Sequence, residues 1–432
     1  MEELVIIIGG GPAGAAAGCY LSKEGIPNLI LESAVHPREH VGESMVTATT
    51  RIFEELNFLE VMEQEGFIHK YGASWHPAKA GASLHVEFSE IEQEGVNQDY
   101  TYQVDRAKMD MLLLKHAEKM GSKVIQGVRV KEVVFENDKA TGVIVNIAGQ
   151  TVTIPCKAIL DASGRHTVIG KQLKIKEADQ NFNQFAVHAW FEGVDRGNRP
   201  NDIHIHFLPV ERGWVWQIPI SDTITSIGVV TDKKVFKGAK EDYEAWFNEM
   251  SQGAPDIAKA LKNAKRVNKI KVEADYSYKM DSFVGNGWML IGDAARFVDP
   301  IFSSGVSIAM HSAKFAVEQL IKALKVDDVS SKMLKPYEDR VKLGTEIWYE
   351  FITLYYRLLP IFTVFISKQE YRLQVIQLLQ GNVYDRASAP VLDAMREFID
   401  TVENTEGHIL KPYLDSSLSN IENTPAPHLA IT

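Results

Sequence analysis

Two patterns of hydrophobic and polar positions divide the chain. In the first, a continuous apolar run leads into glycines: residues 4–8 predict a buried strand, 9–14 a glycine-rich turn, and 13–24 a helix of small residues. A second apolar run over 28–32 predicts the next strand, and residues 158–164 repeat the strand and the glycine turn. This order predicts a Rossmann-like α/β sheet whose first helix begins at the glycines.

The second pattern is strict alternation, which replaces the continuous runs between about 183 and 272. Alternation predicts antiparallel strands, because successive side chains of a strand face opposite sides of the sheet. The expected strands cover 185–190, 203–207, 213–219 and 226–230. Such a sheet has a face that can cover a substrate cavity. The first pattern returns at 287–295, where an apolar strand leads into a loop and a helix.

Helical periodicity accounts for most of the remaining chain. It predicts a helix over about 47–64, an amphipathic helix from Arg106 to Met120 and a mainly helical final hundred residues. We therefore predict an α/β fold with a discontinuous nucleotide-binding domain, an antiparallel sheet domain and a C-terminal helical region. The expected boundaries are 1–175 with 280–330 (including part of the substrate region near 70–100), 176–279, and 331–432 with a loose tail from 414.

The residues of the first turn fit a dinucleotide. Gly9 permits a tight turn, Gly11 lets the backbone approach a pyrophosphate, and Gly14 lets the helix lie close to the strand. Pro12 suits the first helical turn, where a missing N–H costs nothing. Glu32 ends the second strand, where a carboxylate can accept hydrogen bonds from a ribose. The chain is thus predicted to bind a redox cofactor.

Composition excludes several other classes. The formal net charge of −11 argues against a nucleic-acid partner and against an anionic membrane surface. Two cysteines cannot form a disulfide framework, so a reducing cytoplasm is the simplest compartment. The first strand begins at once, which leaves no room for a signal peptide. The longest apolar stretch, 349–366, predicts a buried helical hairpin or a pocket lining rather than a membrane span, since it contains Glu350, Arg357 and Pro360.

The order of the motifs resembles the flavoprotein monooxygenase superfamily, which binds FAD in a glutathione-reductase-like domain. The first glycine turn, Arg106 before a helix, the segment 161–164 and the pair Gly292-Asp293 carry this resemblance. In that superfamily the carboxylate matched by Asp293 contacts the ribityl chain of the flavin. The resemblance implies FAD contacts from Gly9, Gly11, Pro12, Ala13, Gly14, Glu32, Ser33, Gly42, Glu43, Ser44, Arg106, Asp161, Gly164, Gly292, Asp293 and Pro300.

Two further features resemble flavin-dependent halogenases. The segment Trp214-Val215-Trp216-Gln217-Ile218-Pro219 fits their WxWxIP signature, and Lys70 stands where they carry an essential lysine. The segments 297–305 and 348–357 resemble the branch that acts on phenols and on carrier-protein-bound substrates. The family implies that Trp214, Trp216, Ile218 and Pro219 form a wall between substrate and flavin.

This resemblance implies a halogenation mechanism. Reduced FAD, dioxygen and a chloride or bromide ion yield hypohalous acid, and Lys70 directs it to an electron-rich ring carbon. Backbone amides of Ser303, Ser304 and Gly305 are expected to bind the halide, since a helix start attracts anions. The chain contains no second dinucleotide fingerprint, so a separate flavin reductase is the expected partner.

One departure narrows the substrate. Tryptophan halogenases carry a glutamate two residues after the proline of this motif, and here Phe302 follows Pro300 at that spacing. A phenol-like, pyrrole-like or carrier-tethered substrate is therefore favoured over free tryptophan. The alternatives are a monooxygenase, a geranylgeranyl-reductase-like double-bond reductase and a non-catalytic FAD-binding protein. Dependence of product on halide separates the halogenase from all three.

Each feature also has an ordinary structural explanation. Most lysines are solvated, so Lys70 has a functional role only through the family match. Trp214 and Trp216 share one face of a strand, as packed aromatic residues commonly do. His204 and His206 share a strand face as well, but two ligands without a third are incomplete, so no metal site is predicted.

Overall fold

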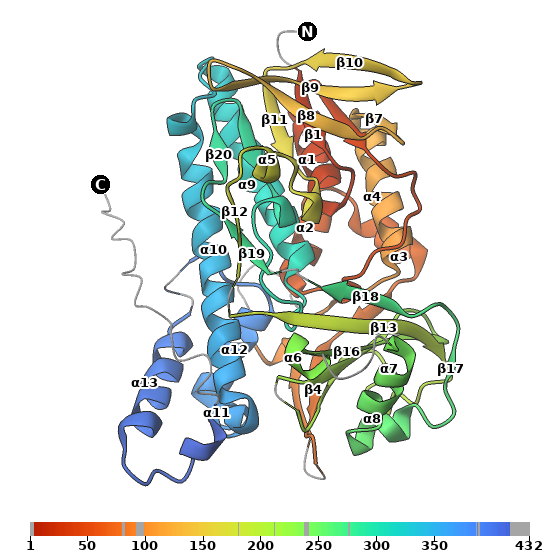
Figure 1. Ribbon diagram of the computed structural model, residues 1–432, viewed down its shortest axis with the longest axis vertical. Helices are drawn as coiled ribbons and strands as arrows, with labels where there is room; N and C mark the ends of the chain where they lie inside the picture. The colour runs from red at the N-terminus through yellow and green to blue at the C-terminus, as the bar shows by residue number, and fades with distance from the viewer. Residues whose placement is uncertain are drawn as a thin grey trace.

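The computed structural model describes residues 4–79, 83–91, 99–179, 181–210, 212–236, 242–274, 277–385, 387 and 389–414. The tail predicted for 414–432 therefore lies almost wholly outside the described residues. Two main sheets, one above the other in Figure 1, are joined along one side by helix α10 (Ser331–Leu358).

The upper sheet has six strands in the order β20-β21-β11-β1-β2-β7. Pairing is parallel except between the first two strands, and Val5 to Ile8 face both Asn28 to Leu31 and Ala158 to Asp161 in register. The central strands are fully buried, as their apolar runs predict. The strands are Val284–Gly285, Trp288–Leu290, Ala158–Asp161, Val5–Ile8, Asn28–Glu32 and Lys123–Gln126.

Three helices cover this sheet and orient its glycine turns. Helix α1 (Pro12–Lys23) packs against both α4 (Arg106–Met120) and α9 (Gly305–Lys325). Small residues make the close approach possible: an ideal Cβ on Gly14 would stand 1.9 Å from the carbonyl oxygen of Gly9. Asp105 caps α4 by accepting the backbone N–H of Ala107.

A three-stranded antiparallel sheet lies at the top of the molecule in Figure 1, beside the first sheet. Its strands are β8 (Val130–Glu136), β9 (Lys139–Ile147) and β10 (Gln150–Pro155). Two small ladders join separate segments: β3 (Ile68–Lys70) with β6 (Thr101–Gln103), and β12 (Lys176–Ala178) with β19 (Tyr278–Met280). Short helical segments between the strands are α5 (Val168–Gln172), η1 (Phe88–Glu90), η2 (Gly164–His166) and η3 (Gly292–Ala294).

The lower sheet contains the alternating strands, and it is larger than the sequence predicts. Its order is β17-β13-β16-β15-β14-β4-β5, with β18 also paired to β13. The four predicted strands are present and pair antiparallel, but β4 joins β14 in parallel from the N-terminal part of the chain. The strands are Lys265–Arg266, Gln184–Glu192, Ile224–Asp232, Trp214–Pro219, Ile203–Phe207, Gly72–His76, Leu84–Glu87 and Lys271–Ala274.

Both faces of the lower sheet are covered. One face packs on Trp246, Phe247 and Ile257 of the helices below it in Figure 1, α6 (Lys233–Phe236), α7 (Tyr243–Ser251) and α8 (Pro255–Ala260). The other face shares a core with Trp348 and Tyr355 of α10. This core continues into the helices η4 (Leu359–Ile361), α11 (Phe362–Ile366), α12 (Gln369–Leu379) and α13 (Val391–Asn404). The short segment η6 (Lys411–Tyr413) follows and has no buried residue.

Two details of the sequence prediction change. The single helix expected over 47–64 is two helices, α2 (Thr47–Glu55) and α3 (Leu59–Glu65), because Asn57 takes the left-handed conformation with φ of 54°. The apolar stretch 349–366 ends α10 and continues through η4 and α11, with most of its described side chains buried. Among the described residues, no helix has the length and apolar content that crossing a membrane requires.

Candidate active site

The first glycine turn has the geometry that the sequence predicts. Gly9 has φ of 105°, which favours glycine, and leads into α1. Gly11 is the N-cap in an extended conformation, with φ of −73° and ψ of −172°. An ideal Cβ on Gly11 meets one group within 4 Å, the Nη2 atom of Arg38 at 3.2 Å. The turn is therefore open above Gly11, and the unpaired amides of α1 face that space.

Glu32 supports this turn from below. Its carboxylate accepts the backbone N–H of Gly10 at 2.6 Å and that of Ala34 at 2.7 Å. Burial alone would raise the pKa of Glu32, but the nearby His36 ring, whose Nε2 lies 3.9 Å from Oε2, and the hydrogen bonds from the two amides lower it to about 2. Glu32 is therefore ionised at neutral pH, and its contact with a ribose stays a prediction.

Arg38 is a site residue that the sequence analysis missed. Its Nη1 atom is buried, lies 3.3 Å from the Asp110 carboxylate and forms no hydrogen bond among the described residues. A guanidinium donor that faces an open glycine turn and a helix N-terminus fits a pyrophosphate. The site residues thus fit FAD. Arg38 lies in a polar loop without periodicity, so no sequence signal marked it.

Arg106 joins the predicted cofactor segments to one another. Its guanidinium pairs with Asp110 at 2.8 Å and donates to the carbonyl oxygens of Val41 and Gly42. These bonds fix the turn at Gly42, whose φ of 100° favours glycine. Arg106 is therefore placed to hold the turn that carries Glu43 and Ser44, and a direct contact with FAD stays a prediction.

Asp161 also acts on the backbone. Its two oxygens accept the N–H groups of Ser163 and Ile169, at 2.9 Å and 2.8 Å. The carboxylate therefore fixes the turn before Gly164, which has φ of 59°. Each oxygen has one backbone partner and can accept a second hydrogen bond, so the contact of Asp161 with FAD stays a prediction.

The predicted cofactor turn at Gly292-Asp293 lies beside the first glycine turn. Gly292 has φ of 60°, and an ideal Cβ there would stand 3.0 Å from the Cβ of Ala13 on α1. Asp293 follows it, and burial raises the pKa of its carboxyl to about 6 although Arg106 and Arg165 oppose the shift. The hydroxyl of Tyr278 donates to the Asp293 carbonyl at 2.6 Å. The structure therefore brings the two predicted cofactor turns together.

Lys70 is buried, not solvated. Its side chain is 3% exposed, and Nζ donates to Ser44 Oγ at 3.0 Å and to the Met45 carbonyl at 2.8 Å. Burial lowers the pKa of Lys70 to about 7, against the opposing charge of Asp202. The ring of Phe88 lies 5.5 Å from Nζ. The amine is thus held against the predicted flavin turn in a state divided between charged and neutral forms at neutral pH.

Glu43 is equally buried. Trp190 of β13 donates from Nε1 to Glu43 Oε1 at 2.6 Å, while Oε2 has no partner among the described residues. Burial raises the pKa of Glu43 to about 7, although hydrogen bonds from Ser226 and Trp190 oppose the shift. Glu43 therefore connects the predicted flavin turn with the lower sheet.

Hydrogen bonds hold both indole rings of the predicted tryptophan wall. Trp214 donates from Nε1 to the hydroxyl of Tyr356 at 3.1 Å, and that hydroxyl donates to Asp299 Oδ1 at 3.2 Å. Asp299 Oδ2 is buried without a partner among the described residues, and burial raises the pKa of Asp299 to about 7. Trp216 donates to Ser226 at 3.1 Å. Ile218 and Pro219, the other predicted wall residues, lie buried on the same strand.

The predicted halide turn leads directly into α9. Ser303 has φ of 58°, an unusual value for serine, and Ser304 is the N-cap. The preceding Phe302 stacks on Phe351 with 4.5 Å between ring centroids, so the position of the expected glutamate is filled by aromatic packing. Pro300, a predicted cofactor residue, accepts the N–H of Ser303 at 3.1 Å.

The paired histidines form no metal centre. His204 Nδ1 lies 2.9 Å from His76 Nε2, and its other nitrogen bonds the Arg199 carbonyl. His206 Nε2 faces Gln217 Oε1 at 3.1 Å. Within the described ranges, no group of three histidine, cysteine or acidic side chains is arranged to hold a metal ion.

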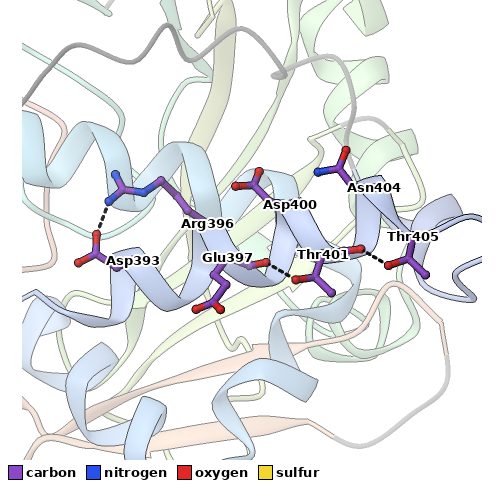
Figure 2. A pocket seen from close by; sticks show the side chains of 7 residues that line it. All are labelled: Asp393, Arg396, Glu397, Asp400, Thr401, Asn404 and Thr405. Atoms are coloured by element: carbon purple, nitrogen blue, oxygen red, sulfur yellow. Dashed lines mark hydrogen bonds and ion pairs between the residues drawn. The ribbon is translucent and has the colours of Figure 1, made fainter.

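Two hollows lie away from Lys70. The first, about 490 Å³, follows the polar face of α13, where Figure 2 shows the hydroxyls of Thr401 and Thr405 turned back to carbonyls of their own helix. It contains none of the predicted site residues. The second, about 460 Å³, includes Tyr278 and Phe182, whose ring stands 5.9 Å from that of Tyr356. The second hollow therefore borders the residue that bonds the Asp293 carbonyl, Tyr278.

Comparison with known proteins agrees with this geometry. The tryptophan halogenase family matches residues 4–98 and 90–360. The chain is 44% identical to a 1H-pyrrole-2-carbonyl-[peptidyl-carrier protein] chlorinase of Pseudomonas fluorescens over 95% of this chain and 96% of that protein. It is 32% identical to the corresponding brominase of Pseudoalteromonas luteoviolacea over 88% of this chain and 92% of that protein.

A solved structure has the same fold. The flavin-dependent brominase Bmp2 superposes with a TM-score of 0.84 at 29% identity, over 93% of this chain and 99% of Bmp2. The family match covers well over half of the chain, and both pyrrole-carbonyl relatives exceed 30% identity across most of it. The chain therefore belongs to the tryptophan halogenase family and is a flavin-dependent halogenase.

Proposed function

We propose that this enzyme halogenates a pyrrole-2-carbonyl group carried by a peptidyl carrier protein, and that a separate flavin reductase supplies it with reduced FAD. The near-complete alignment with a carrier-dependent chlorinase and brominase supports the substrate class. The described residues provide one dinucleotide turn of the predicted kind, which supports an external reductase. The free cysteines Cys19 and Cys156 support a reducing compartment.

The single observation that carries the activity is the placement of Lys70. Its buried amine is bonded to Ser44 and Met45, at the end of the turn that begins with Gly42. An amine with a pKa near neutrality can donate hydrogen bonds as ammonium or accept a halogen as free amine. A surface lysine would stay protonated at neutral pH and could not offer a free amine. Lys70 is thus suited to receive hypohalous acid and present it to the substrate.

The remaining residues hold FAD and the halide. The amides that begin α1, together with Arg38, neutralise the pyrophosphate, and Asp293 contacts the ribityl chain. The bound reduced cofactor supplies hypohalous acid from dioxygen and halide. The first amides of α9, at Ser304 and Gly305, have no carbonyl one turn earlier in the helix, so they are available to a chloride or bromide ion.

The substrate side is aromatic with one polar acceptor. Phe302, Phe351 and Tyr355 pack together, and the wall of Trp214 lies in the same core. Asp299 Oδ2 is an unpaired acceptor in this region, suited to the N–H of a pyrrole. An electron-rich pyrrole needs less activation than an indole carbon remote from its nitrogen. This is consistent with Phe302 at the position of the glutamate.

Mass spectrometry of reaction mixtures tests the proposal. Enzyme, FAD, a flavin reductase, NADH, oxygen and pyrrolyl-loaded carrier protein should give halogenated pyrrole when chloride or bromide is present. Free pyrrole-2-carboxylate should react poorly, since the carrier is part of the proposed substrate. Product that forms without halide would identify a monooxygenase, and bound FAD without any product would identify a non-catalytic flavoprotein.

A further inference from the structure

Lys70 has a buried carboxylate near it that the proposed mechanism does not use. Asp202 is 4% exposed and directly precedes β14. Parallel pairing of β14 with β4 sets Ile203 opposite Ala73, so Asp202 lies beside Gly72, two residues beyond Lys70. The Gly72 backbone N–H favours the ionised form of this carboxylate. The neighbouring Asn201 carbonyl accepts a hydrogen bond from Gln103 at 3.2 Å, which ties this loop to β6 beside Lys70. Asp202 is therefore fixed next to the strand that carries the amine.

The two groups act on one another electrostatically. Asp202 is the charged neighbour that opposes the burial-driven fall in the pKa of Lys70. Burial raises the pKa of Asp202 to about 6, while Arg199 and Lys70 oppose that shift and Glu87 adds to it. Asp202 and Lys70 therefore each favour the charged form of the other.

Asp202 also leads to the surface. Its Oδ2 lies 3.3 Å from Nδ1 of His85, and Nε2 of His85 lies 3.4 Å from Glu87. The exposed fraction of these side chains rises from 6% to 19% to 45% along that path. Ser74 also contacts His85 Nδ1, at 3.1 Å, and Arg199 pairs with Glu87 at 2.7 Å. Proton-carrying groups therefore extend from the interior to solvent.

We propose that Asp202 is a positioning residue for the halogenation step: it keeps the Lys70 amine protonated for oxidant delivery and exchanges protons with solvent through His85. This inference rests on the proposed delivery role of Lys70. It assigns a specific task to a carboxylate that the sequence pattern did not mark.

The step balances with these groups. The ring carbon forms a bond to halogen as the O–halogen bond of hypohalous acid breaks. The departing oxygen takes a proton from the Lys70 ammonium and leaves as water. The ring then loses its proton, and Lys70 regains one through Asp202 and His85. Overall, the aromatic C–H and hypohalous acid become the aromatic C–halogen bond and water.

An ordinary structural role makes a different prediction. If Asp202 served only to accept the Gly72 amide, Asp202→Asn would be neutral for Lys70, because the asparagine carbonyl can accept the same N–H. If the charge matters, Asp202→Asn should lower the pKa of Lys70. A nearby opposite charge shifts the pKa of a buried group by about one unit or more. Asp202→Glu retains the charge and should restore the native value.

NMR of protein labelled with ¹³C at lysine Cε measures this pKa without any halogenation. Lys70→Ala identifies the resonance by its loss. The midpoint should fall by about one pH unit in Asp202→Asn. It should stay unchanged in the matched control Asp256→Asn, which removes a half-exposed carboxylate bonded to His76 in the same sheet. If asparagine prevents folding, Asp202→Ser offers a smaller acceptor. An unchanged midpoint in a folded variant overturns the inference.

The pH profile of turnover supplies the second measurement. Halogenation should fall on the alkaline side as Lys70 loses its proton, and Asp202→Asn should move that limb to lower pH while hypohalite formation is unaffected. Identical alkaline limbs in the native protein and in Asp202→Asn also overturn the inference. If the NMR midpoint shifts in Asp202→Asn but the protein makes no halogenated product, the delivery role of Lys70 is overturned instead. Failure of the Asp202 inference and failure of the Lys70 role are therefore distinguishable.

Discussion

Lys70 Nζ and Ser44 Oγ meet across a hydrogen bond of 3.0 Å, and this contact joins a short ladder to the predicted flavin turn. Ser44 also pairs with Gln103 in an isolated bridge, so the turn is aligned along β6, the partner strand of Lys70. The amine therefore cannot move independently of the turn. Oxidant made at the flavin would reach Lys70 along a path fixed by backbone pairing.

Lys70→Ala should separate oxidant formation from its delivery. Loss of a positioned group commonly costs a factor of about 10²–10⁴ in rate, so halogenated product should fall by at least that lower value. FAD binding and oxygen consumption should remain, because the amine contacts only Ser44 and Met45 among the hydrogen-bond acceptors. Product is measured by mass spectrometry and hypohalite by a chemical trap.

Two further variants sharpen this test. Lys70→Arg should also lose product, since a guanidinium stays protonated and cannot give a proton to the departing oxygen. Lys108→Ala, which removes a half-exposed lysine, should keep native turnover. Native product formation by Lys70→Ala would remove the lysine from the mechanism.

Gly11→Val should abolish FAD binding without unfolding the protein. Gly11 has an extended backbone that valine also adopts, and an ideal Cβ meets only Arg38 Nη2. The added methyl groups would occupy the space where the pyrophosphate approaches. Flavin absorbance after gel filtration measures binding, and circular dichroism checks the fold. Native FAD content in folded Gly11→Val would contradict the proposed site.

The sequence predicted what depends on local chemistry. Gly9, Gly14 and Gly292 have the conformations or close approaches that their motifs require, since only glycine satisfies those constraints. Long-range partners were not predictable. Arg38 faces Gly11 from an irregular loop, and Asp202 reaches Gly72 because β4 and β14 pair in parallel, which no periodicity indicates.

Ser303→Gly should leave halide use unchanged, whereas Ser303→Val should weaken it. Ser303 has φ of 58°, where glycine is unstrained and a β-branched residue costs about 1–3 kcal/mol. Glycine should therefore keep the turn and its affinity for bromide, while valine should distort it. Anomalous diffraction from bromide-soaked crystals locates the ion, and the halide concentration for half-maximal rate reports affinity. Bromide bound only at surface lysines would argue against this turn.

Tyr356→Phe should loosen the tryptophan wall. The hydroxyl accepts from Trp214 Nε1 and donates to Asp299 Oδ1, so its removal leaves the buried Trp214 donor unpaired, while Asp299 Oδ1 keeps the backbone N–H of Ile301. Such a loss costs about 1–3 kcal/mol of stability. We also expect more hypohalite to escape for each halogenated product. Phe362→Leu in the same core is the control, since it changes packing without a hydrogen bond.

Lys70→Met should stabilise the protein most near pH 7. The pKa of Lys70 is about 7 in the folded protein and near its ordinary value of 10.5 in the unfolded chain. Between these values the unfolded chain binds a proton that the folded protein lacks. The unfolding free energy of the native protein therefore has no penalty from Lys70 above pH 10.5, and this penalty grows as pH decreases towards 7. Methionine abolishes this dependence. The unfolding free energy that the methionine variant gains over the native protein should shrink by about 1.4 kcal/mol for each unit that pH rises across that range. Urea unfolding at pH 7.5 and pH 9 measures the difference, with Lys108→Met as the exposed control. An equal gain in unfolding free energy at both pH values would contradict a lowered pKa of Lys70 in the folded protein.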